Sequence, residues 1–223
     1  MKCIYCNYFK LYTISTTQVK CASCKRKFST KKIFQNKNII NSFIDNTTIN
    51  QCSKKLKLNY ETIKNTYEKI RKNIAIYLEE NYNHNNVVAY EEYIYIEKSK
   101  KHQKKHIFDA KTFICFEYEN KVFCLLMPSL QKYKNQFLSD GADEIYYKEL
   151  SKFLMFNKIS KNKKEQTLIH RFLFYFEEEI LKYKGISNKN FFYYLKEIEF
   201  KFNYNKNNQE EILNYLIINS SST

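Results

Sequence analysis

The chain has 223 residues and a formal net charge of +15, which favours an anionic partner. Apolar residues make up 43% of it and aromatic residues 17%, which is enough for a folded core and argues against a disordered chain. It contains no long uncharged apolar run, so we expect no transmembrane helix and no membrane partner. Its odd number of cysteines, seven, favours a reducing environment and hence a cytoplasmic location.

The positive charge is concentrated in the N-terminal third. Residues 1–77 contain sixteen Lys and Arg against three acidic residues, a net charge of +13, whereas residues 78–223 contain twenty-two against twenty, a net charge of +2. A lysine-rich codon bias would spread lysine along the chain without removing acidic residues from one third of it. We therefore expect the basic third to contact a polyanion.

Four cysteines near the N-terminus form two C-x-x-C pairs that are separated by fourteen residues. Two such pairs, each on a tight turn, supply the four sulfur ligands of a tetrahedral zinc ion when a hairpin brings them together. The alternative is a disulfide pair in a secreted chain. However, no apolar signal segment follows Met1-Lys2, and three further cysteines leave an odd total, which fits a reducing compartment. The sequence predicts a zinc ribbon over residues 1–32 with the ligands Cys3, Cys6, Cys21 and Cys24.

Three helices are predicted after the ribbon. Apolar residues between positions 39 and 44 form one face of the first helix, and Thr47 or Thr48 can cap a second helix over residues 49–56. A short turn then leads to a longer helix over residues 60–77. Two short helices, a tight turn and a third helix are typical of the helix-turn-helix motif.

Basic and amide side chains in this third of the chain are suited to DNA. The outward positions of the third helix combine residue types that read bases with others that bind phosphates, and a basic run follows the ribbon. The alternative is a helical linker with a solvated face, and for the basic run a solvated connection. The residues expected to contact DNA are Lys25, Arg26, Lys27, Thr62, Lys64, Asn65, Lys69, Arg71 and Lys72.

From residue 87 the pattern changes to strands. Residues 87–96 are rich in β-formers and carry Glu91-Glu92 in their middle, and two further strands flank Asn120-Lys121 as a hairpin. An acidic turn at residues 137–143 follows. We expect helices over residues 144–156, 166–184 and 190–202, and then a terminal amphipathic helix.

This order of elements resembles one group of bacterial insertion-sequence transposases, whose catalytic domain has the RNase H-like fold of DDE enzymes. The resemblance covers nearly the whole chain. It is sharpest in the ribbon, at Cys21-Ala22-Ser23-Cys24-Lys25-Arg26-Lys27-Phe28-Ser29, and near the C-terminus, where Lys184-Gly185-Ile186 precedes Leu195-Lys196-Glu197-Ile198-Glu199-Phe200-Lys201-Phe202-Asn203-Tyr204. The last run is similar to the family's L-K-E-x-E-F-R-F-N, with Lys201 in place of Arg.

The resemblance implies a catalytic site with two divalent ions, Mg²⁺ or Mn²⁺, held by three acidic residues. Glu91 stands where the family has the Asp of a D-E pair, although a shift of one residue would place Tyr90 there. The second acid matches Asp140, with Asp143 in reserve, and the third position falls on His170, a poor ligand for Mg²⁺ but acceptable for Mn²⁺. The candidate catalytic residues are Glu91, Asp140 and His170.

The structural alternative for these three residues is a strand-edge charge, a turn former and an ordinary histidine. The acidic run Glu177-Glu178-Glu179 does not replace them, because on a helix its side chains point in different directions and a solvated face is expected.

The predicted fold class is α+β with several modules. These are a zinc ribbon (1–32), a helix-turn-helix segment (33–78), a reduced RNase H-like mixed α/β domain with C-terminal helices (87–205) and a terminal helix with a polar tail (206–223). The predicted function is that of a transposase-like protein that binds double-stranded DNA and, if active, cuts and joins DNA ends. The alternatives are a catalytically inactive, transposase-derived DNA-binding or regulatory protein and an RNA-binding zinc protein. A homodimer is one option for the oligomeric state.

Overall fold

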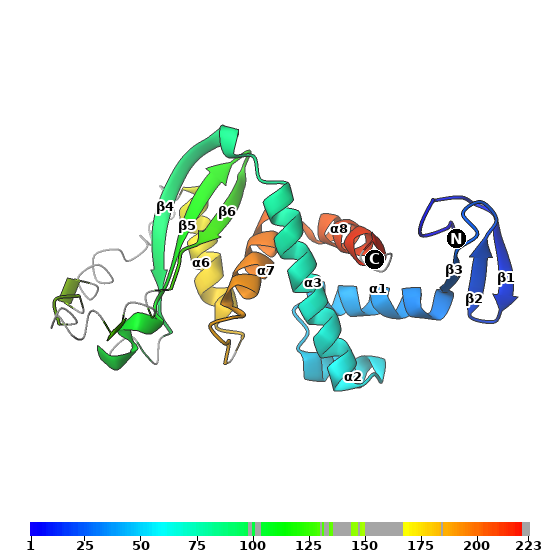
Figure 1. Cartoon of the computed structure of the whole chain (residues 1–223), viewed down its shortest axis with the longest axis horizontal. Coiled ribbons are helices and arrows are strands. Elements are labelled where there is room, and N and C mark those ends of the chain that lie inside the picture. Colours follow the sequence, from blue (N-terminus) through cyan, green and yellow to red (C-terminus); the bar gives the residue numbers. More distant parts are fainter. Residues whose placement is uncertain are drawn as a thin grey trace. The chain divides into compact units, whose positions relative to one another are not determined.

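The N-terminal segment of the computed structural model folds into a small antiparallel sheet (Figure 1). Its strands are β1 (Leu11–Ser15), β2 (Gln18–Cys21) and β3 (Lys27–Ser29), in the order β1-β2-β3. The two cysteine pairs lie before β1 and between β2 and β3. The hairpin predicted from the cysteine spacing is therefore confirmed.

The structure describes residues 1–97, 100, 104–129, 131, 134–135, 144–146, 148–149, 167–183 and 185–219. The chain divides into two compact units, of which the first is Met1–Tyr77 with Tyr204–Thr223 and the second is Leu78–Asn203. No helix among the described residues is long and apolar enough to cross a membrane.

Three helices follow the ribbon: α1 (Thr30–Ile44), α2 (Ile49–Leu56) and α3 (Tyr60–Glu80). The helices α2 and α3 begin where the sequence predicts them, whereas α1 already begins at Thr30, within the residues assigned to the ribbon, and α3 continues three residues beyond position 77. Thr48 begins α2 with a capping box, in which its hydroxyl accepts from the Gln51 N–H at 3.3 Å and the Gln51 side chain accepts from the Thr48 N–H at 3.1 Å. Lys57 ends α2 in the left-handed conformation at φ +53°, which turns the chain within three residues into α3.

Aromatic and apolar side chains between α1 and α3 form the interior of this helical part. Phe43 packs edge-on against Tyr67 at 5.1 Å between ring centroids, and the Tyr67 hydroxyl donates to the Thr47 carbonyl at 3.0 Å. The buried apolar residues of the two helices include Ile39, Ile40, Phe43, Ile63, Tyr67, Ile70 and Ile74.

The last helix, α8 (Lys206–Asn219), packs on α1. Leu213 and Ile217 are its buried apolar residues, and two ion pairs join the helices. Lys37 lies 3.2 Å from Glu210, and Lys206 lies 2.7 Å from Asp45. The terminal helix, which the sequence alone separates from the rest, thus completes the first unit.

The second unit contains an antiparallel sheet of β4 (Val87–Tyr95), β5 (Lys111–Tyr118) and β6 (Lys121–Leu126), in the order β4-β5-β6. The short helices η1 (His84–Asn86) and η2 (Lys104–Asp109) precede β4 and β5. The predicted hairpin is present, but its turn is one residue earlier than expected. Glu119 and Asn120 adopt positive φ angles, as a two-residue hairpin loop requires, and Lys121 already belongs to β6.

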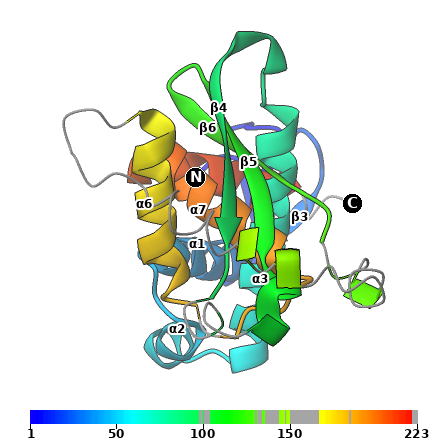
Figure 2. The same ribbon diagram turned by 90° about the vertical axis from the view of Figure 1, so that its left-hand side faces the viewer.

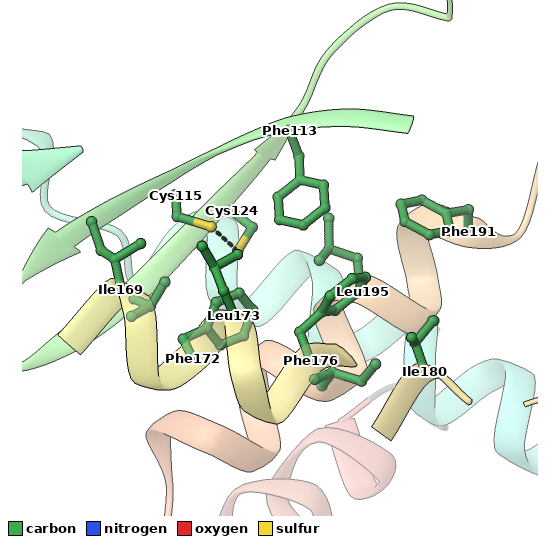
Figure 3. Close-up of a cluster of buried hydrophobic side chains, with 12 residues drawn as sticks. Phe113, Cys115, Cys124, Ile169, Phe172, Leu173, Phe176, Ile180, Phe191 and Leu195 are labelled. Carbon is green, nitrogen blue, oxygen red and sulfur yellow. Dashed lines mark hydrogen bonds between the residues drawn. The ribbon is translucent and has the colours of Figure 1, made fainter. Parts of the chain in front are cut away.

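Two helices, α6 (Leu168–Ile180) and α7 (Phe191–Asn203), cover one face of this sheet (Figures 1 and 2). Phe172 and Phe176 of α6 meet Phe113 of β5 and Leu195 of α7 in the core (Figure 3). The thiols of Cys115 and Cys124, which are directly paired across β5 and β6, lie 3.5 Å apart and are completely buried in this core. The predicted turn at residues 137–143 and most of the predicted helix 144–156 lie outside the described residues.

Polar side chains of α7 bind the edge of the sheet. Because β6 has a strand partner on one side only among the described residues, its outward backbone groups need other partners. The side-chain amide of Asn203 accepts from the Val122 N–H at 2.9 Å and donates to the Val122 carbonyl at 2.7 Å. One turn earlier on the helix, the Glu199 carboxylate accepts from the Cys124 N–H at 3.1 Å.

The Lys196 ammonium compensates the negative charge of the buried Glu199 carboxylate. Both side chains are fully buried, and the Lys196 ammonium lies 3.0 Å from Oε2 of Glu199 and 3.6 Å from the ring centroid of Phe123. Burial is the largest effect on Glu199 and raises its pKa, against the opposing attraction of Lys196. Its Oε1 is buried without a hydrogen-bond partner among the described residues, so the ammonium is a necessary partner for this carboxylate.

We predict that Lys196→Met destabilises the second unit by about 3–5 kcal/mol, because it leaves a buried carboxylate without its ammonium partner. Chemical denaturation followed by circular dichroism measures this loss. The double variant Lys196→Met with Glu199→Leu removes both charges and should recover much of the stability. A single variant as stable as the parent chain would contradict the assigned role of the pair.

Candidate functional site

The sulfur atoms of the four N-terminal cysteines converge at one end of the ribbon. Sγ of Cys3 lies 3.6 Å from Sγ of Cys24, and Sγ of Cys6 lies 3.6 Å from Sγ of Cys21. All four lie within 4.8 Å of one another. Zinc–sulfur bonds of about 2.3 Å in a tetrahedron place the sulfurs about 3.8 Å apart. The cluster can therefore hold a structural zinc ion, as the spacing predicts.

Each cysteine pair lies on a turn that ends in a left-handed residue, Asn7 at φ +57° and Lys25 at φ +61°. The Tyr5 N–H donates to Sγ of Cys3 at 3.4 Å. A backbone hydrogen bond from Tyr8 is the largest effect on Cys6 and lowers the pKa of its thiol to about 7. Since zinc binds the thiolate, these backbone donors favour the form of the site that the metal needs.

The ribbon has few other sources of stability. Phe28 is its one buried side chain besides Cys3 and Cys21 among the described residues, and it packs edge-on against Tyr5 at 6.0 Å between ring centroids. Partly buried Ile4, Leu11, Val19 and Ile33 complete its small core. An apolar core of this size does not hold three short strands, so we expect a metal ion bound by the four thiols to supply the missing free energy.

We expect the purified chain to bind one zinc ion, and its removal with a chelator to unfold the ribbon while the sheet of the second unit persists. Elemental analysis gives the stoichiometry, and amide hydrogen exchange separates the two units. Cys24→Ser should lose the zinc, because oxygen is a weaker ligand for this site than a thiolate.

Cys52→Ala is the matched control, because Cys52 is buried in α2, outside the cluster. This variant should keep the full zinc content. A parent chain without stoichiometric zinc, or with a ribbon equally protected after chelation, would show that the four thiols do not form a structural metal site.

The second unit brings two of the three candidate catalytic residues together. Glu91 on β4 and His170 on α6 lie 3.1 Å apart between Oε2 and Nε2, and both side chains are about one-third exposed. Glu91 lies on the strand face that also carries Tyr93 and faces the helices, whereas Tyr90 lies on the opposite face and is 68% exposed. Only Glu91 of these neighbouring positions thus faces the helix that carries His170.

A second polar pair, which the sequence analysis did not identify, lies beside the first. The Tyr93 hydroxyl donates to Oε1 of Glu177 at 2.5 Å, and burial, together with this carboxylate, raises the pKa of Tyr93. Tyr93 follows Glu91 by two residues on β4, and Glu177 follows His170 by two helical turns on α6. Residues two apart on a strand share a face, and so do residues seven apart on a helix. Once Glu91 is matched with His170, this periodicity predicts that Tyr93 lies opposite Glu177.

The acidic run on α6 is not a uniformly solvated face. Its three side chains do point in different directions, as expected, but only Glu178 is exposed. Glu179 is 8% exposed and pairs with Lys182, and Glu177 is half-buried against Tyr93. The expectation of a solvated face was wrong for these two residues, because the sheet and the chain after α6 cover them.

Asp140 and its reserve Asp143 lie outside the described residues. In the part of the chain that the structure describes, the four cysteines are the one group of three or more potential metal ligands that are close enough to share an ion. Glu91 and His170 alone do not complete a two-metal site.

Most of the residues predicted to contact DNA are accessible. Lys25, Arg26 and Lys27 are exposed after the second cysteine pair, with the Arg26 guanidinium 4.9 Å from the ring centroid of Tyr5. On α3, Lys64 is half-buried and forms an ion pair with Glu61 at 3.5 Å. The exposed predicted residues of α3 are Thr62, Asn65, Lys69 and Lys72.

Arg71 does not face outward, and this part of the prediction was wrong. It is 6% exposed, and its guanidinium lies 5.6 Å from the ring centroid of Phe43 and 5.9 Å from that of Tyr67. The flat guanidinium stacks on aromatic rings, so an arginine can occupy an interior position that the helical period assigns to the boundary of the apolar face.

No family model matches the chain, and no curated protein or solved structure gives a significant match to it. The site is therefore interpreted from its own residues.

Proposed function

We propose that this protein binds duplex DNA through α3 of a helix-turn-helix, next to a zinc ribbon, as a transposase-like DNA-binding protein. In such a motif the second and third helices are joined by a tight turn, and the third helix enters the major groove. The short connection from α2 to α3 through Lys57, Leu58 and Asn59 supports this assignment.

One observation carries the proposal. The exposed residues Thr62, Asn65, Lys69 and Lys72 are spaced by three, four and three positions along α3. This spacing keeps them on one helical face. An amide that suits base edges and two ammonium groups that suit phosphates then share one accessible surface. The net charge of +13 on residues 1–77 supplies the electrostatic attraction that such binding needs.

We expect the double variant Lys69→Ala with Lys72→Ala to weaken duplex binding, because each lysine neutralises a phosphate. The slope of the logarithm of affinity against the logarithm of salt concentration should fall by about 0.9 per lost contact. Fluorescence anisotropy with a duplex, repeated over several salt concentrations, measures both quantities.

Lys189→Ala is the matched control, since this lysine is exposed just before α7 in the second unit and should leave the salt slope unchanged. If the control and the α3 variant behave alike, α3 is not the DNA-binding helix.

A second candidate function is metal-dependent cutting and joining of DNA ends by an RNase H-like second unit. The proximity of Glu91 and His170, from separate elements and on the side of the sheet that the helices cover, supports it. The same contact is also expected in a catalytically inactive derivative, because an imidazole in place of a carboxylate disfavours Mg²⁺ binding. Activity is the property that separates the two.

If the unit is active, Mn²⁺ should support end cleavage or strand transfer on linear duplexes, and Asp140→Asn should abolish it without changing duplex affinity. Gel analysis of labelled DNA provides the measurement. Absence of products with either Mn²⁺ or Mg²⁺ would select the inactive, DNA-binding derivative.

A further inference from the structure

We propose that the outer face of the ribbon sheet, defined as Lys10, Tyr12, Lys20 and Lys27, binds single-stranded nucleic acid by stacking a base on Tyr12. This site is distinct from the duplex-binding face of α3 and does not depend on that assignment.

The strand register places these residues on one face. Tyr12 of β1 is paired with Lys20 of β2, and Lys20 is paired with Lys27 of β3. Side chains of directly paired residues in an antiparallel sheet project to the same side, so an aromatic ring and two ammonium groups form one row across all three strands. The neighbouring row, with Val19 opposite Phe28, packs into the small core on the other side.

The ring of Tyr12 is available to a ligand. The residue is 50% exposed, and the Lys10 ammonium lies 5.8 Å from the centroid of its ring. Phe9, which precedes β1, is 72% exposed and lies 4.8 Å from Tyr8 between ring centroids. A ribbon of this size therefore presents several accessible rings next to cations.

Charge complementarity selects the kind of partner. Residues 1–44 contain no Asp or Glu, so no acidic side chain of the ribbon or of α1 offsets these lysines. A polyanion with flat apolar faces matches lysines interleaved with an aromatic ring. In a duplex the base faces are stacked inside the helix, whereas in a single strand they are free to stack on a side chain. The occupant is therefore a single strand.

Stacking and phosphate neutralisation predict different effects on binding. Tyr12→Ala should lower single-strand affinity about tenfold or more, because stacking on an aromatic side chain contributes a large share of such binding, whereas Tyr12→Phe should retain it. Lys20→Ala or Lys27→Ala should mainly reduce the salt slope, by about 0.7 per lost phosphate contact.

The experiment uses the full-length, zinc-loaded chain with fifteen-nucleotide probes of oligo-dT and oligo-U and with a duplex of mixed sequence. Anisotropy gives the affinities, and quenching of a 2-aminopurine placed in the DNA probe reports base stacking. Tyr90→Ala is the control, because Tyr90 is also an exposed strand tyrosine, at 68%, and lies outside the ribbon. Zinc content is measured for every variant, to show that the ribbon is intact.

The proposal predicts that Tyr12→Ala loses single-strand affinity and 2-aminopurine quenching while duplex affinity and zinc content stay the same. Comparison of the two single-stranded probes identifies DNA or RNA as the preferred partner. Unchanged single-strand binding by Tyr12→Ala, or an equal loss for single strand and duplex, would overturn it. Loss of duplex binding in the α3 variants is a separate result and tests only the helix-turn-helix.

Discussion

The second unit depends on the contact between α7 and the open edge of β6. In the described part of the sheet, the outer backbone groups of β6 face no neighbouring strand and would otherwise bond to water or to another chain. The side chains of Glu199 and Asn203, one helical turn apart on α7, bond to these groups in place of a strand. Lys196 then neutralises the carboxylate inside the core. These residues thus join the helix to the sheet through both charge and backbone hydrogen bonds.

The sequence predicted local structure well where one short-range rule decides it. The cysteine spacing predicted the ribbon, and the two candidate caps Thr47 and Thr48 marked the start of α2, where the structure shows Thr48 as the cap. The sequence-based prediction failed for charged side chains that are buried in the fold. Arg71 and Glu179 are charged, yet both are buried, because an aromatic stack in one case and a neighbouring lysine in the other compensate the charge. Such compensation depends on the tertiary fold and leaves no trace in the helical period.

The candidate catalytic residues show the same limit. Alignment with a resembled family placed Glu91 and His170 in the site, and they do lie in contact. The adjacent pair of Tyr93 and Glu177 could not be found this way, since it requires knowing which face of β4 meets α6. Two stacked polar pairs between a strand and a helix can hold these elements in register with or without a metal. The proximity of Glu91 and His170 is therefore explained by packing as well as by catalysis.

The distribution of thiols makes the two units chemically distinguishable. Cys6 is exposed, so a metal-free ribbon offers an accessible thiol to an alkylating reagent. Cys115 and Cys124 lie in the core of the other unit, where burial is the largest cause of the raised pKa of Cys124 and the reagent has no access. Labelling at these two positions requires the core to open. The chain thus carries its own probes, one for the loss of the ion and another for global unfolding.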